Sequence, residues 1–354
     1  MDTITDEKLH FLCSRRAHPD TSGPIDLIET HMSWVVLAGE RALKLKKPIR
    51  TDWFDFSTLK AREFNAREEL RLNRRLAPEV YLGLLALTYQ NGRYTLVEDT
   101  KAPTDGSTVD WLVHMRRLPP TRMLDQMISA DSVSYGDIEA LVDVLARFYR
   151  YTSRATLIAD DYIARFASEQ KLNRRVLLQP RFSLNSASAL LDAFDMAIQE
   201  HKAALRIRVL QKRLVDGHGD LRPEHVCLLP TPVVIDALEF STALRQVDPL
   251  DELAYLGLEC DLIGAPWVAG RLRSRYSLAL NDPAPIGLMN FYTASRALLR
   301  ARLCMAHLLD ADETRATDQW LPRARLYLER ARRALQQPVS KPTPHGFVEV
   351  HRQP

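Results

Sequence analysis

The amino-acid sequence predicts an α+β fold with a small β-rich N-terminal part and a larger, mainly helical C-terminal part. Apolar runs of strand length gather in the first 120 residues, and helical periodicity begins near Asp137. A short stretch of strand and loop character interrupts the helices at residues 214–240. Prolines recur after Gln336, which predicts that residues 338–354 form a loose tail.

The strands expected in the N-terminal part are short apolar runs bounded by turn residues. Gly39 lies in the turn between the first two runs and predicts a β-hairpin, and Asn91-Gly92 marks a second turn. A helix is expected between these two hairpins, from about Leu59 to Leu76. The predicted strands are residues 32–37, 42–46, the two halves of 81–97, and 111–118.

Helical periodicity dominates the C-terminal part. Ile138, Leu141, Leu145 and Phe148 recur at a spacing that builds one apolar helix face. Similar patterns predict further helices on both sides of the strand-and-loop stretch. These helices are residues 162–170, 187–206, 250–262, 286–309 and 322–335.

Length and composition restrict the class of protein. The 354 residues carry 48 Lys and Arg against 45 Asp and Glu, a formal net charge of +3, with 46% hydrophobic and 26% charged residues. This composition is typical of globular proteins, and the charge balance argues against a dedicated nucleic-acid or membrane-surface binder. We therefore expect neither nucleic acid nor a membrane as a partner.

The N-terminal and cysteine patterns favour one compartment. The first 20 residues lack the apolar core of a signal peptide, and no apolar run approaches the roughly 18–20 residues that span a bilayer. The four cysteines are scattered and form no CxxC pair, as expected for reduced thiols. These patterns predict a cytoplasmic protein.

Two acidic residues mark the segment with the strongest chemical signal. Asp220 lies in a loop that contains Gly219 and Pro223, and Asp236 ends a short apolar run. A tight reversal of the chain would bring the carboxylates together, one to accept a proton from a hydroxyl and one to bind Mg²⁺, which prefers oxygen ligands. Each acid alone also fits a turn or a strand end, because Asp is a common turn residue. The two acids, taken together in this order, favour a catalytic and metal-binding role over two unrelated turn positions.

This segment resembles the catalytic loop of the aminoglycoside phosphotransferase and choline kinase-like group. The run from His218 to His225 reads H-G-D-L-R-P-E-H, which is also similar to the protein-kinase loop H-R-D-L-K-P-E-N. Residues 247–254 read V-D-P-L-D-E-L-A and resemble the G-D-P-x-x-D-L-A stretch of the phosphotransferases. The resemblance extends over residues 25–307, and within the group it is to a bacterial branch of uncharacterised proteins.

The resemblance implies a bilobal protein kinase-like fold and an ATP-dependent small-molecule phosphotransferase that uses Mg²⁺. Its nucleotide-binding lobe would be residues 1–118, and its catalytic and substrate lobe residues 119–337. By the same resemblance, Asp220 acts as the base and Asp236 as a metal ligand. Arg222 would neutralise the transferring phosphoryl group.

The same resemblance implies roles for a lysine and a glutamate in the N-terminal part. The run from Ala42 to Lys44 is similar to the kinase motif whose lysine reaches the α- and β-phosphates, and Glu69 lies where its partner glutamate would be. Lys46 projects from the same face of a strand as Lys44, so either lysine could contact phosphate. Lys44 is preferred because Ala42 precedes it as in the motif. Lys46 and Lys47 are expected to be solvated.

His225 departs from the pattern of the group, which has asparagine there as an oxygen ligand for magnesium. Neutral imidazole suits softer metals better than Mg²⁺. Three interpretations stay open: Glu239 or water completes a magnesium shell, His225 binds a metal such as Mn²⁺, or the site is weakened. We favour altered coordination, with Asp236 and His225 as the metal ligands.

The phosphate loop and the hinge are the remaining nucleotide-binding predictions. Residues 28–33 contain no glycine, so backbone amides and the hydroxyl of Thr30 or Ser33 are expected to meet phosphate. Met115 begins the segment that resembles the hinge, whose backbone would bond adenine. As an isolated feature, Met115 fits a core position better.

The acceptor is predicted to be a small molecule with a hydroxyl group. Polycationic aminoglycosides need an acidic pocket, whereas acids near the C-terminus are diffuse and outnumbered by arginines. A neutral or anionic acceptor therefore fits as well or better. A competing interpretation is a nucleotide-binding pseudokinase with a regulatory role, which His225 favours and the joint presence of Lys44, Asp220 and Asp236 opposes. A protein substrate is disfavoured because the stretch from Asp236 to Asp248 is short for an activation segment.

Overall fold

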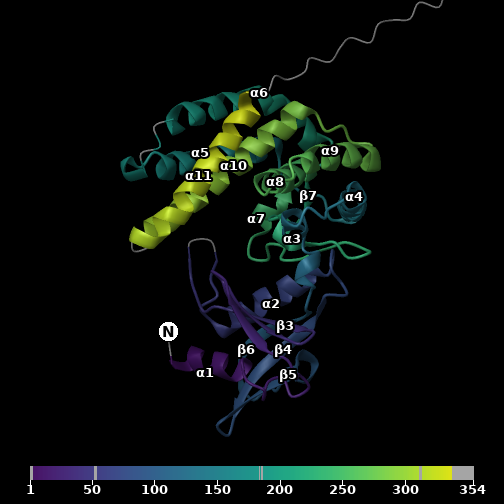
Figure 1. Ribbon diagram of the computed structural model, residues 1–354, viewed down its shortest axis with the longest axis vertical. Coiled ribbons are helices and arrows are strands. Elements are labelled where there is room, and N and C mark those ends of the chain that lie inside the picture. Colours follow the sequence, from purple (N-terminus) through teal and green to yellow (C-terminus); the bar gives the residue numbers. More distant parts are fainter. Residues whose placement is uncertain (1–2, 52–53, 183, 185, 311–312, 337–354) are drawn as a thin grey trace, which may run out of the picture. The chain divides into compact units, whose positions relative to one another are not determined.

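Two compact units make up the described chain (Figure 1). The computed structural model describes residues 3–51, 54–182, 184, 186–310 and 313–336. The first unit contains the described residues of Met1–Ala159 and Ile207–Asp282, and the second those of Asp160–Arg206 and Pro283–Pro354. The predicted tail at 338–354 lies outside the described residues.

A six-stranded sheet forms the N-terminal part of the first unit. The sequence predicts five of its strands, and the strand at residues 25–29 was not predicted. Its strand order is β1-β2-β3-β6-β4-β5, and each neighbouring pair is antiparallel. The last strand ends at Arg116, close to residue 118, where the end of a nucleotide-binding lobe is expected. The strands are β1 (Ile25–Glu29), β2 (Ser33–Ala38), β3 (Arg41–Lys46), β4 (Tyr81–Gln90), β5 (Arg93–Glu98) and β6 (Thr108–Arg116).

The helices of the first unit lie before, within and after the sheet in chain order. Ser134 caps α4 with a capping box completed by Asp137, and Thr58 caps α2. The helices are α1 (Thr3–Leu12), α2 (Leu59–Asn73), α3 (Leu124–Ser129), α4 (Tyr135–Tyr151), α7 (Thr242–Arg245), α8 (Pro249–Leu262) and α9 (Trp267–Leu280).

The two faces of the sheet bury different apolar clusters. Leu43 of β3 packs in a cluster with Leu12 of α1, whereas its neighbour Ala42 packs in another with Ala66 of α2. Because side chains alternate along a strand, residues 44 and 46 share the face of Ala42. The sheet therefore directs two lysines toward the face that α2 covers.

Two short antiparallel ladders build the predicted strand-and-loop stretch. Strand β7 (Val215–Asp216) pairs with β10 (Gln246–Val247), and β8 (Val226–Cys227) pairs with β9 (Val233–Val234). The loop that carries Asp220 joins β7 to β8. Asp236 follows β9 by two residues, so short ladders anchor the segments that hold both acids.

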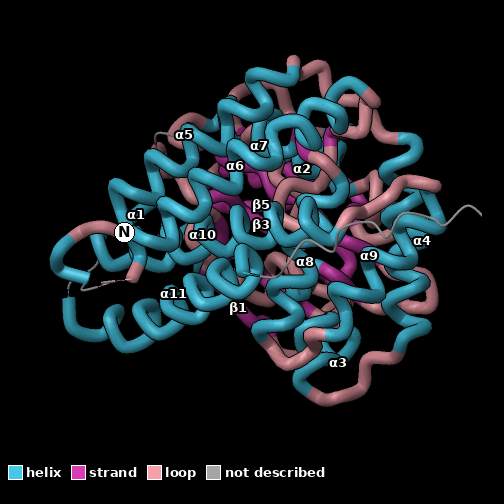
Figure 2. The backbone as a smooth tube through the Cα atoms, turned by 90° about the horizontal axis from the view of Figure 1, so that it is seen from above, coloured by secondary structure: helices cyan, strands magenta, loops and turns pink. Residues whose placement is uncertain are grey.

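The second unit is helical, as Figure 2 shows in cyan. It contains α5 (Ala159–Leu177), most of α6 (Ala187–Leu210), α10 (Ile286–Asp310) and α11 (Glu313–Gln336). Phe291 of α10 lies 5.0 Å from Phe166 and 5.4 Å from Phe194, measured between ring centroids. Aromatic contacts of this kind join its helices.

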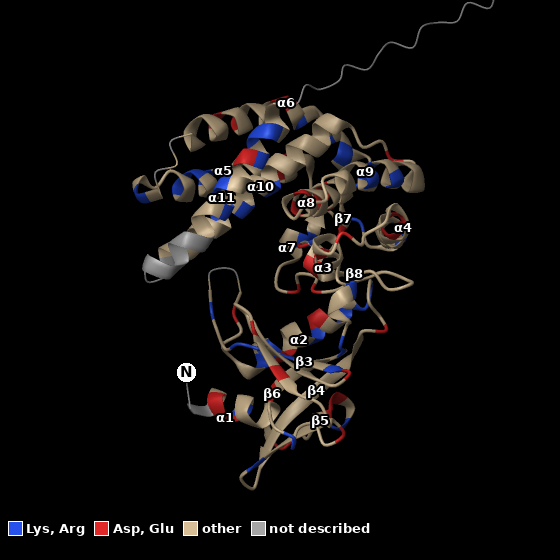
Figure 3. Ribbon diagram, viewed as in Figure 1, with Lys and Arg blue, Asp and Glu red and all other residues tan. Residues whose placement is uncertain are grey.

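Acidic and basic side chains are interspersed over the helices and strands (Figure 3). The cysteines Cys13, Cys227, Cys260 and Cys304 are free, and the last three are buried. Among the residues described, no helix is both long enough and apolar enough to cross a membrane.

Candidate active site

Glu252 of α8 fixes the start of the loop between β7 and β8. Its Oε1 accepts hydrogen bonds from the backbone NH groups of His218 (2.7 Å) and Gly219 (2.6 Å), and its Oε2 accepts one from the Tyr149 hydroxyl (2.8 Å). Glu252 is buried, so these charge-assisted bonds hold the loop firmly. A Cβ atom at Gly217 would lie only 2.6 Å from Oε1, which explains the glycine at that position.

His218 links the two segments that carry the acids. Its Nε2 donates to the carbonyl oxygen of Ile235 (2.8 Å), and its Nδ1 accepts from the backbone NH of Asp220 (3.3 Å). The carbonyl partner requires a proton on Nε2, which defines a neutral imidazole. Burial lowers the pKa of His218 to about 4. The ring is therefore neutral at pH 7.

Arg222 and Tyr255 hold the Asp220 carboxylate. Asp220 Oδ2 accepts a hydrogen bond from Arg222 Nε (3.1 Å), and Oδ1 accepts one from the Tyr255 hydroxyl (3.2 Å). Arg222 also forms an ion pair with Glu224 at 2.7 Å. The Asp220 side chain stays 24% exposed, so the carboxylate is oriented without being sealed in the core.

His225 lies between the two acids. Its Nδ1 donates to the carbonyl oxygen of Asp220 (2.8 Å) and is 3.7 Å from Oδ2 of the same residue. Because Nδ1 carries the proton, the lone pair is on Nε2, which is 3.7 Å from Asp236 Oδ2 and 3.3 Å from Arg222 Nη2. The imidazole ring of His225 therefore lies between the carboxylates of Asp220 and Asp236.

The backbone at Asp236 adopts a left-handed conformation, with φ of +65°. Asp tolerates this region better than most residues do. The NH of Asp236 donates to the Tyr81 hydroxyl (3.1 Å), and the NH of Ala237 donates to Asn73 Oδ1 (2.9 Å). The Asp236 side chain is 42% exposed.

A chain of ion pairs extends from Asp236 to the two lysines of β3. Lys44 Nζ is 2.5 Å from Asp236 Oδ1 and 2.8 Å from Glu69 Oε1. Lys46 Nζ is 2.7 Å from Glu69 Oε2 and 2.5 Å from Glu239 Oε1. Glu69 is fully buried, and each of its oxygens faces one lysine.

The charges in this chain shift the pKa values of its members. Burial alone would lower the pKa of Lys44, but Asp236 and Glu69 raise it well above its usual value. Partial burial would raise the pKa of Asp236, yet the adjacent Lys44 ammonium brings it below its usual value. Lys44 is therefore cationic and Asp236 anionic at neutral pH.

Lys46 contradicts the expectation that it is solvated. It is 2% exposed, because Glu69 and Glu239 supply carboxylates to its ammonium group. The ring of Phe56 also lies 5.1 Å from Lys46 Nζ, measured to its centroid. The same expectation is wrong for Lys47, whose side chain is only 15% exposed.

The position of Glu239 does not support the interpretation in which it completes a magnesium shell. Its carboxylate pairs with Lys46, and burial raises its pKa above the usual value even though Lys46 opposes the shift. Across the described part of the chain, no group of three or more His, Cys, Asp or Glu residues has a metal-binding arrangement. The proposed ligand atoms, Asp236 Oδ2 and His225 Nε2, lie 3.7 Å apart.

Ser33 and Met115 both lie in the sheet. The NH of Ser33 donates to Thr30 Oγ1 (2.9 Å), and its carbonyl oxygen accepts from the Thr30 NH (2.9 Å), which closes the glycine-free turn between β1 and β2. Met115 is buried and pairs with Ala42 on one side and Tyr81 on the other. It is a core residue of the face that carries the two lysines.

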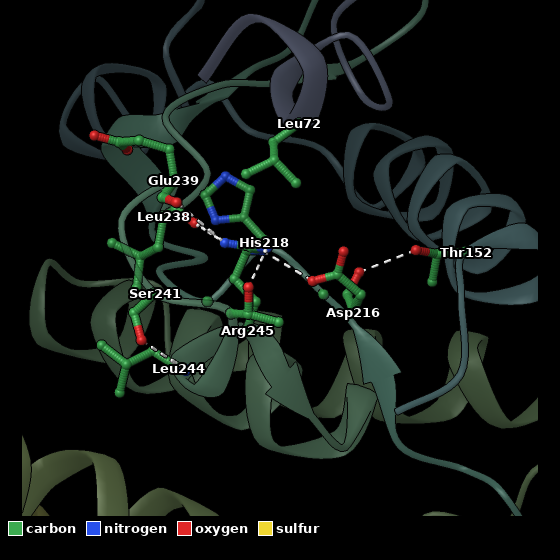
Figure 4. Close-up of polar contacts among 12 residues, drawn as sticks. Leu72, Thr152, Asp216, His218, Leu238, Glu239, Ser241, Leu244 and Arg245 are labelled. Carbon is green, nitrogen blue, oxygen red and sulfur yellow. Dashed lines mark hydrogen bonds and ion pairs between the residues drawn. The ribbon is translucent and has the colours of Figure 1, made fainter. Parts of the chain in front are cut away.

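Some of the side chains that hold this site were not identified from the sequence. Figure 4 shows Asp216 between Thr152 and Arg245. Asp216 Oδ1 accepts from Arg245 Nε (2.9 Å), and Arg245 Nη1 donates to the carbonyl oxygen of Leu238 (2.6 Å). Arg245 thus ties the strand before the Asp220 loop to the segment after Asp236. No local pattern in the sequence marks this contact.

Two other missed residues did carry a signal. Asn73 follows Glu69 by four positions in a predicted helix, and that spacing places both on one helix face. Glu252 occupies the acidic position in the stretch that resembles G-D-P-x-x-D-L-A. Tyr81, in contrast, appears in the sequence only as an apolar strand residue.

Solved structures identify the class of fold. A choline/ethanolamine kinase family protein from Mesorhizobium loti matches with a TM-score of 0.52 and 15% identity, over 95% of this chain and 96% of its own. A mutant aminoglycoside 2′-phosphotransferase-IIIa in complex with GDP matches with a TM-score of 0.52 and 14% identity, over 92% and 97%. Choline kinase from Cryptosporidium parvum matches with a TM-score of 0.52 and 9% identity, over 93% and 96%.

These likenesses confirm the bilobal protein kinase-like fold that the catalytic-loop resemblance implies. The fold is that of the aminoglycoside phosphotransferase and choline kinase-like group. No family model matches the chain.

Sequence relatives come from Mycobacterium. Uncharacterized proteins of Mycobacterium bovis and of two strains of Mycobacterium tuberculosis are each 32% identical to this chain over 293 residues. The match covers 81% of this chain and 56% of each relative. The chain therefore spans little more than half the length of the curated relatives that it matches.

Proposed function

We propose that the protein transfers the γ-phosphoryl group of ATP to a hydroxyl group of a small molecule. One observation carries the proposal: His225 lies within 3.7 Å of the carboxylates of both Asp220 and Asp236, and Lys44 contacts the second of them. Phosphoryl transfer needs a group that accepts a proton, a carboxylate for a metal ion and a cation for phosphate. The small-molecule kinases that share the fold support this class of reaction.

Asp220 is the proposed base. As the acceptor oxygen bonds to the γ-phosphorus, the bond from phosphorus to the leaving ADP oxygen breaks, and the hydroxyl proton passes to the Asp220 carboxylate. Tyr255 and Arg222 orient that carboxylate through the two hydrogen bonds described above. Arg222 is assigned to neutralise charge on the transferring phosphoryl group.

The lysine-bearing face of the sheet is the proposed nucleotide site. Lys44, held by Glu69, is assigned to the α- and β-phosphates. Ser33 pairs with Lys46 in the register of β2 and β3, so its side chain lies on the same face and near the proposed phosphate position. Met115 belongs to the apolar cluster of this face and is assigned to the adenine ring.

Asp236 and His225 are the proposed metal ligands. A bound Mg²⁺ or Mn²⁺ ion neutralises charge on the nucleotide phosphates. Mg²⁺ is often held by only one or two carboxylates together with phosphate oxygens and water, so Asp236 suffices as the acidic ligand. The imidazole of His225 extends the choice toward Mn²⁺. Arg222 Nη2, now 3.3 Å from His225 Nε2, would have to leave that nitrogen.

A screen for ATP consumption tests the proposal. Hydroxyl metabolites and aminoglycosides are offered with ATP and either Mg²⁺ or Mn²⁺, and Asp220→Asn serves as the blank. Asp26→Asn, on an exposed position of β1, is the matched control. We expect at least one compound to be phosphorylated by the wild-type protein and the control, with a rate at least about 100-fold lower in Asp220→Asn. Equal rates in all three proteins would remove Asp220 from catalysis.

A nucleotide-binding regulatory protein with little turnover is the second candidate. It is favoured by the direct pairing of Lys44 with Asp236 and of Arg222 with His225, because cations then contact both proposed metal ligands. Saturable ATP binding without turnover of any acceptor would support this candidate over the first.

A further inference from the structure

We infer that Asn73 and Tyr81 are positioning residues that hold Asp236 in the orientation needed to bind metal. Neither side chain is part of the proposed catalytic or ligand set. The inference rests on the proposed function, because it takes Asp236 as a metal ligand. Through these two side chains, the N-terminal part of the fold sets the orientation of Asp236.

The two residues capture consecutive backbone NH groups. Tyr81 Oη accepts from the NH of Asp236 (3.1 Å), and Asn73 Oδ1 accepts from the NH of Ala237 (2.9 Å). Both side chains are about 1% exposed, so water does not readily replace them. The peptide between residues 236 and 237 therefore has its orientation set by side chains from α2 and β4.

The backbone conformation of Asp236 makes this support necessary. Its φ of +65° is a region that residues with a Cβ atom avoid unless their surroundings hold them there. If the residue returned to a right-handed or extended conformation, its carboxylate would leave Lys44 and His225. The two hydrogen bonds oppose that rotation.

Asn73 also couples Asp236 to the lysine side of the site. Its Nδ2 donates to the carbonyl oxygen of Glu69 (2.9 Å), which fixes the amide so that Oδ1 faces Ala237. One face of α2 thus carries both the partner of Lys44 and the acceptor that holds the Asp236 segment. A displacement of α2 would disturb the phosphate-binding lysine and the metal ligand together.

Tyr81 is held rigidly enough to act as a fixed acceptor. It is the first residue of β4, and its ring packs in the same apolar cluster as Ala42 and Met115. Burial, then the Glu69 carboxylate, raises the pKa of Tyr81 well above its usual value, so the hydroxyl stays neutral. Phenylalanine would keep the packing and remove only the acceptor.

Tyr81→Phe and Asn73→Leu test the inference, because each removes one acceptor. Matched controls exist on the same elements or the same sheet. Tyr94→Phe removes an exposed hydroxyl from β5, and Asn65→Leu removes an amide that makes the same bond to the carbonyl four residues earlier in α2. The measurement is the dissociation constant of ATP by calorimetry, with Mn²⁺ and with metal chelated.

Each test variant is expected to weaken ATP binding in Mn²⁺ by about 3- to 10-fold, the effect of one lost hydrogen bond. Binding without metal should stay unchanged, since the Lys44 side of the site keeps its groups. Both controls should bind as the wild type does. A purely structural role would instead weaken binding equally with and without metal, which would overturn the inference.

Two further outcomes decide between the inference and the proposed function. If the wild-type protein binds ATP in a metal-dependent manner and both test variants match it, the inference alone is wrong. If the wild-type protein shows no metal-dependent ATP binding, the proposed function fails and the inference fails with it. Should Asn73→Leu lose its cooperative thermal transition, the result for Tyr81→Phe decides.

Discussion

His225 shows how a single side chain sets the character of the proposed metal site. Its Nδ1 donates to the Asp220 carbonyl oxygen, and this leaves the Nε2 lone pair 3.7 Å from Asp236 Oδ2. Asparagine at the same position would offer an amide oxygen instead of a nitrogen. Since hard cations prefer oxygen and borderline metals accept imidazole, metal preference depends on this one residue.

Replacing His225 with Asn is expected to shift the metal preference toward Mg²⁺. The ratio of the ATP dissociation constant in Mg²⁺ to that in Mn²⁺ should fall relative to the wild type, because an oxygen replaces the imidazole nitrogen. His10→Asn, at an exposed position of α1, is the control and should leave the ratio unchanged. An unaltered ratio in His225→Asn would show that the imidazole is not a ligand.

His218 gives the protein a defined sensitivity to acid. Its pKa is about 4 in the folded chain because it is buried, and about 6.5 in an unfolded chain. On acidification the unfolded state takes up the proton first, so the contribution of the neutral ring to stability is complete above about pH 6.5 and is lost as the pH falls toward 4. The free energy of unfolding lost in this way over the whole pH range is about 3 kcal/mol.

Comparison of the wild type with His218→Gln isolates this effect. The difference in free energy of unfolding between the two proteins, measured by urea denaturation, is expected to narrow steadily from pH 6.5 to pH 4.5. A difference that stays constant over this range would mean that the folded ring already titrates normally.

Strand β3 and helix α2 form the element pair on which the site depends most. Lys44 and Lys46 leave β3 on one face, and Glu69 of α2 lies between them. The resulting chain of charges is buried, so its members stabilise the fold only while all are present. Glu239 completes it from the segment after Asp236.

Removing Lys46 is therefore expected to be far more costly than removing its neighbour. Lys46→Met leaves Glu69 and Glu239 buried without their shared cation, and we expect a loss of about 3–5 kcal/mol in the free energy of unfolding. Lys47→Met removes a lysine whose partner, Glu29, is half exposed, and should cost less than about 1 kcal/mol.

The double variant Lys46→Met/Glu239→Gln provides an internal check by urea denaturation. It removes one of the uncompensated carboxylates, so part of the lost stability should return. Similar losses for Lys46→Met and Lys47→Met would contradict the buried charge chain.

Several of the strands and helices around the site were predicted from the sequence, and others were not. The hairpin of β2 and β3, helix α2 and the strands around Asn91-Gly92 were predicted, because their apolar patterns and turn residues are local. Helix α1 was not predicted, since its apolar residues gather at its C-terminal end and gain their role only against the sheet. Strand β6 begins at Thr108, before the apolar run that predicted it.

Some features of the candidate site were predicted from the sequence and others were not. The sequence predicted the residues of the catalytic loop and Asp236, because they form a continuous, recognisable run. It predicted the wrong environment for Lys46, whose partner Glu239 is 193 residues away in the chain. The roles of Asp216 and Tyr81 likewise depend on contacts across the fold that no local pattern reports.

At the scale of the whole molecule, every proposed nucleotide and metal contact lies in the first compact unit. Lys44, Glu69, Asp220 and Asp236 all belong to it, although they are far apart in the chain. A ligand that binds only the folded state stabilises it by mass action, by about 2.7 kcal/mol at 100 times its dissociation constant. That stabilisation should be greatest in the unit that holds the ligand.

Hydrogen exchange with and without ATP and Mn²⁺ tests this localisation. We expect added protection in β3, α2 and the residues 233–239, which carry the proposed contacts. Helix α11, in the second unit, serves as the internal reference and should change less. Protection confined to α10 and α11 would place the nucleotide elsewhere.

The metal dependence of ATP binding in Asp236→Asn, compared with that in Asp220→Asn, tests the proposed metal site most directly. We expect Asp236→Asn to lose at least about 10-fold in affinity for ATP in Mn²⁺, because the acidic ligand is gone, and Asp220→Asn to bind as the wild type does. Unchanged metal-dependent binding in Asp236→Asn would contradict the assignment on which the proposed function depends.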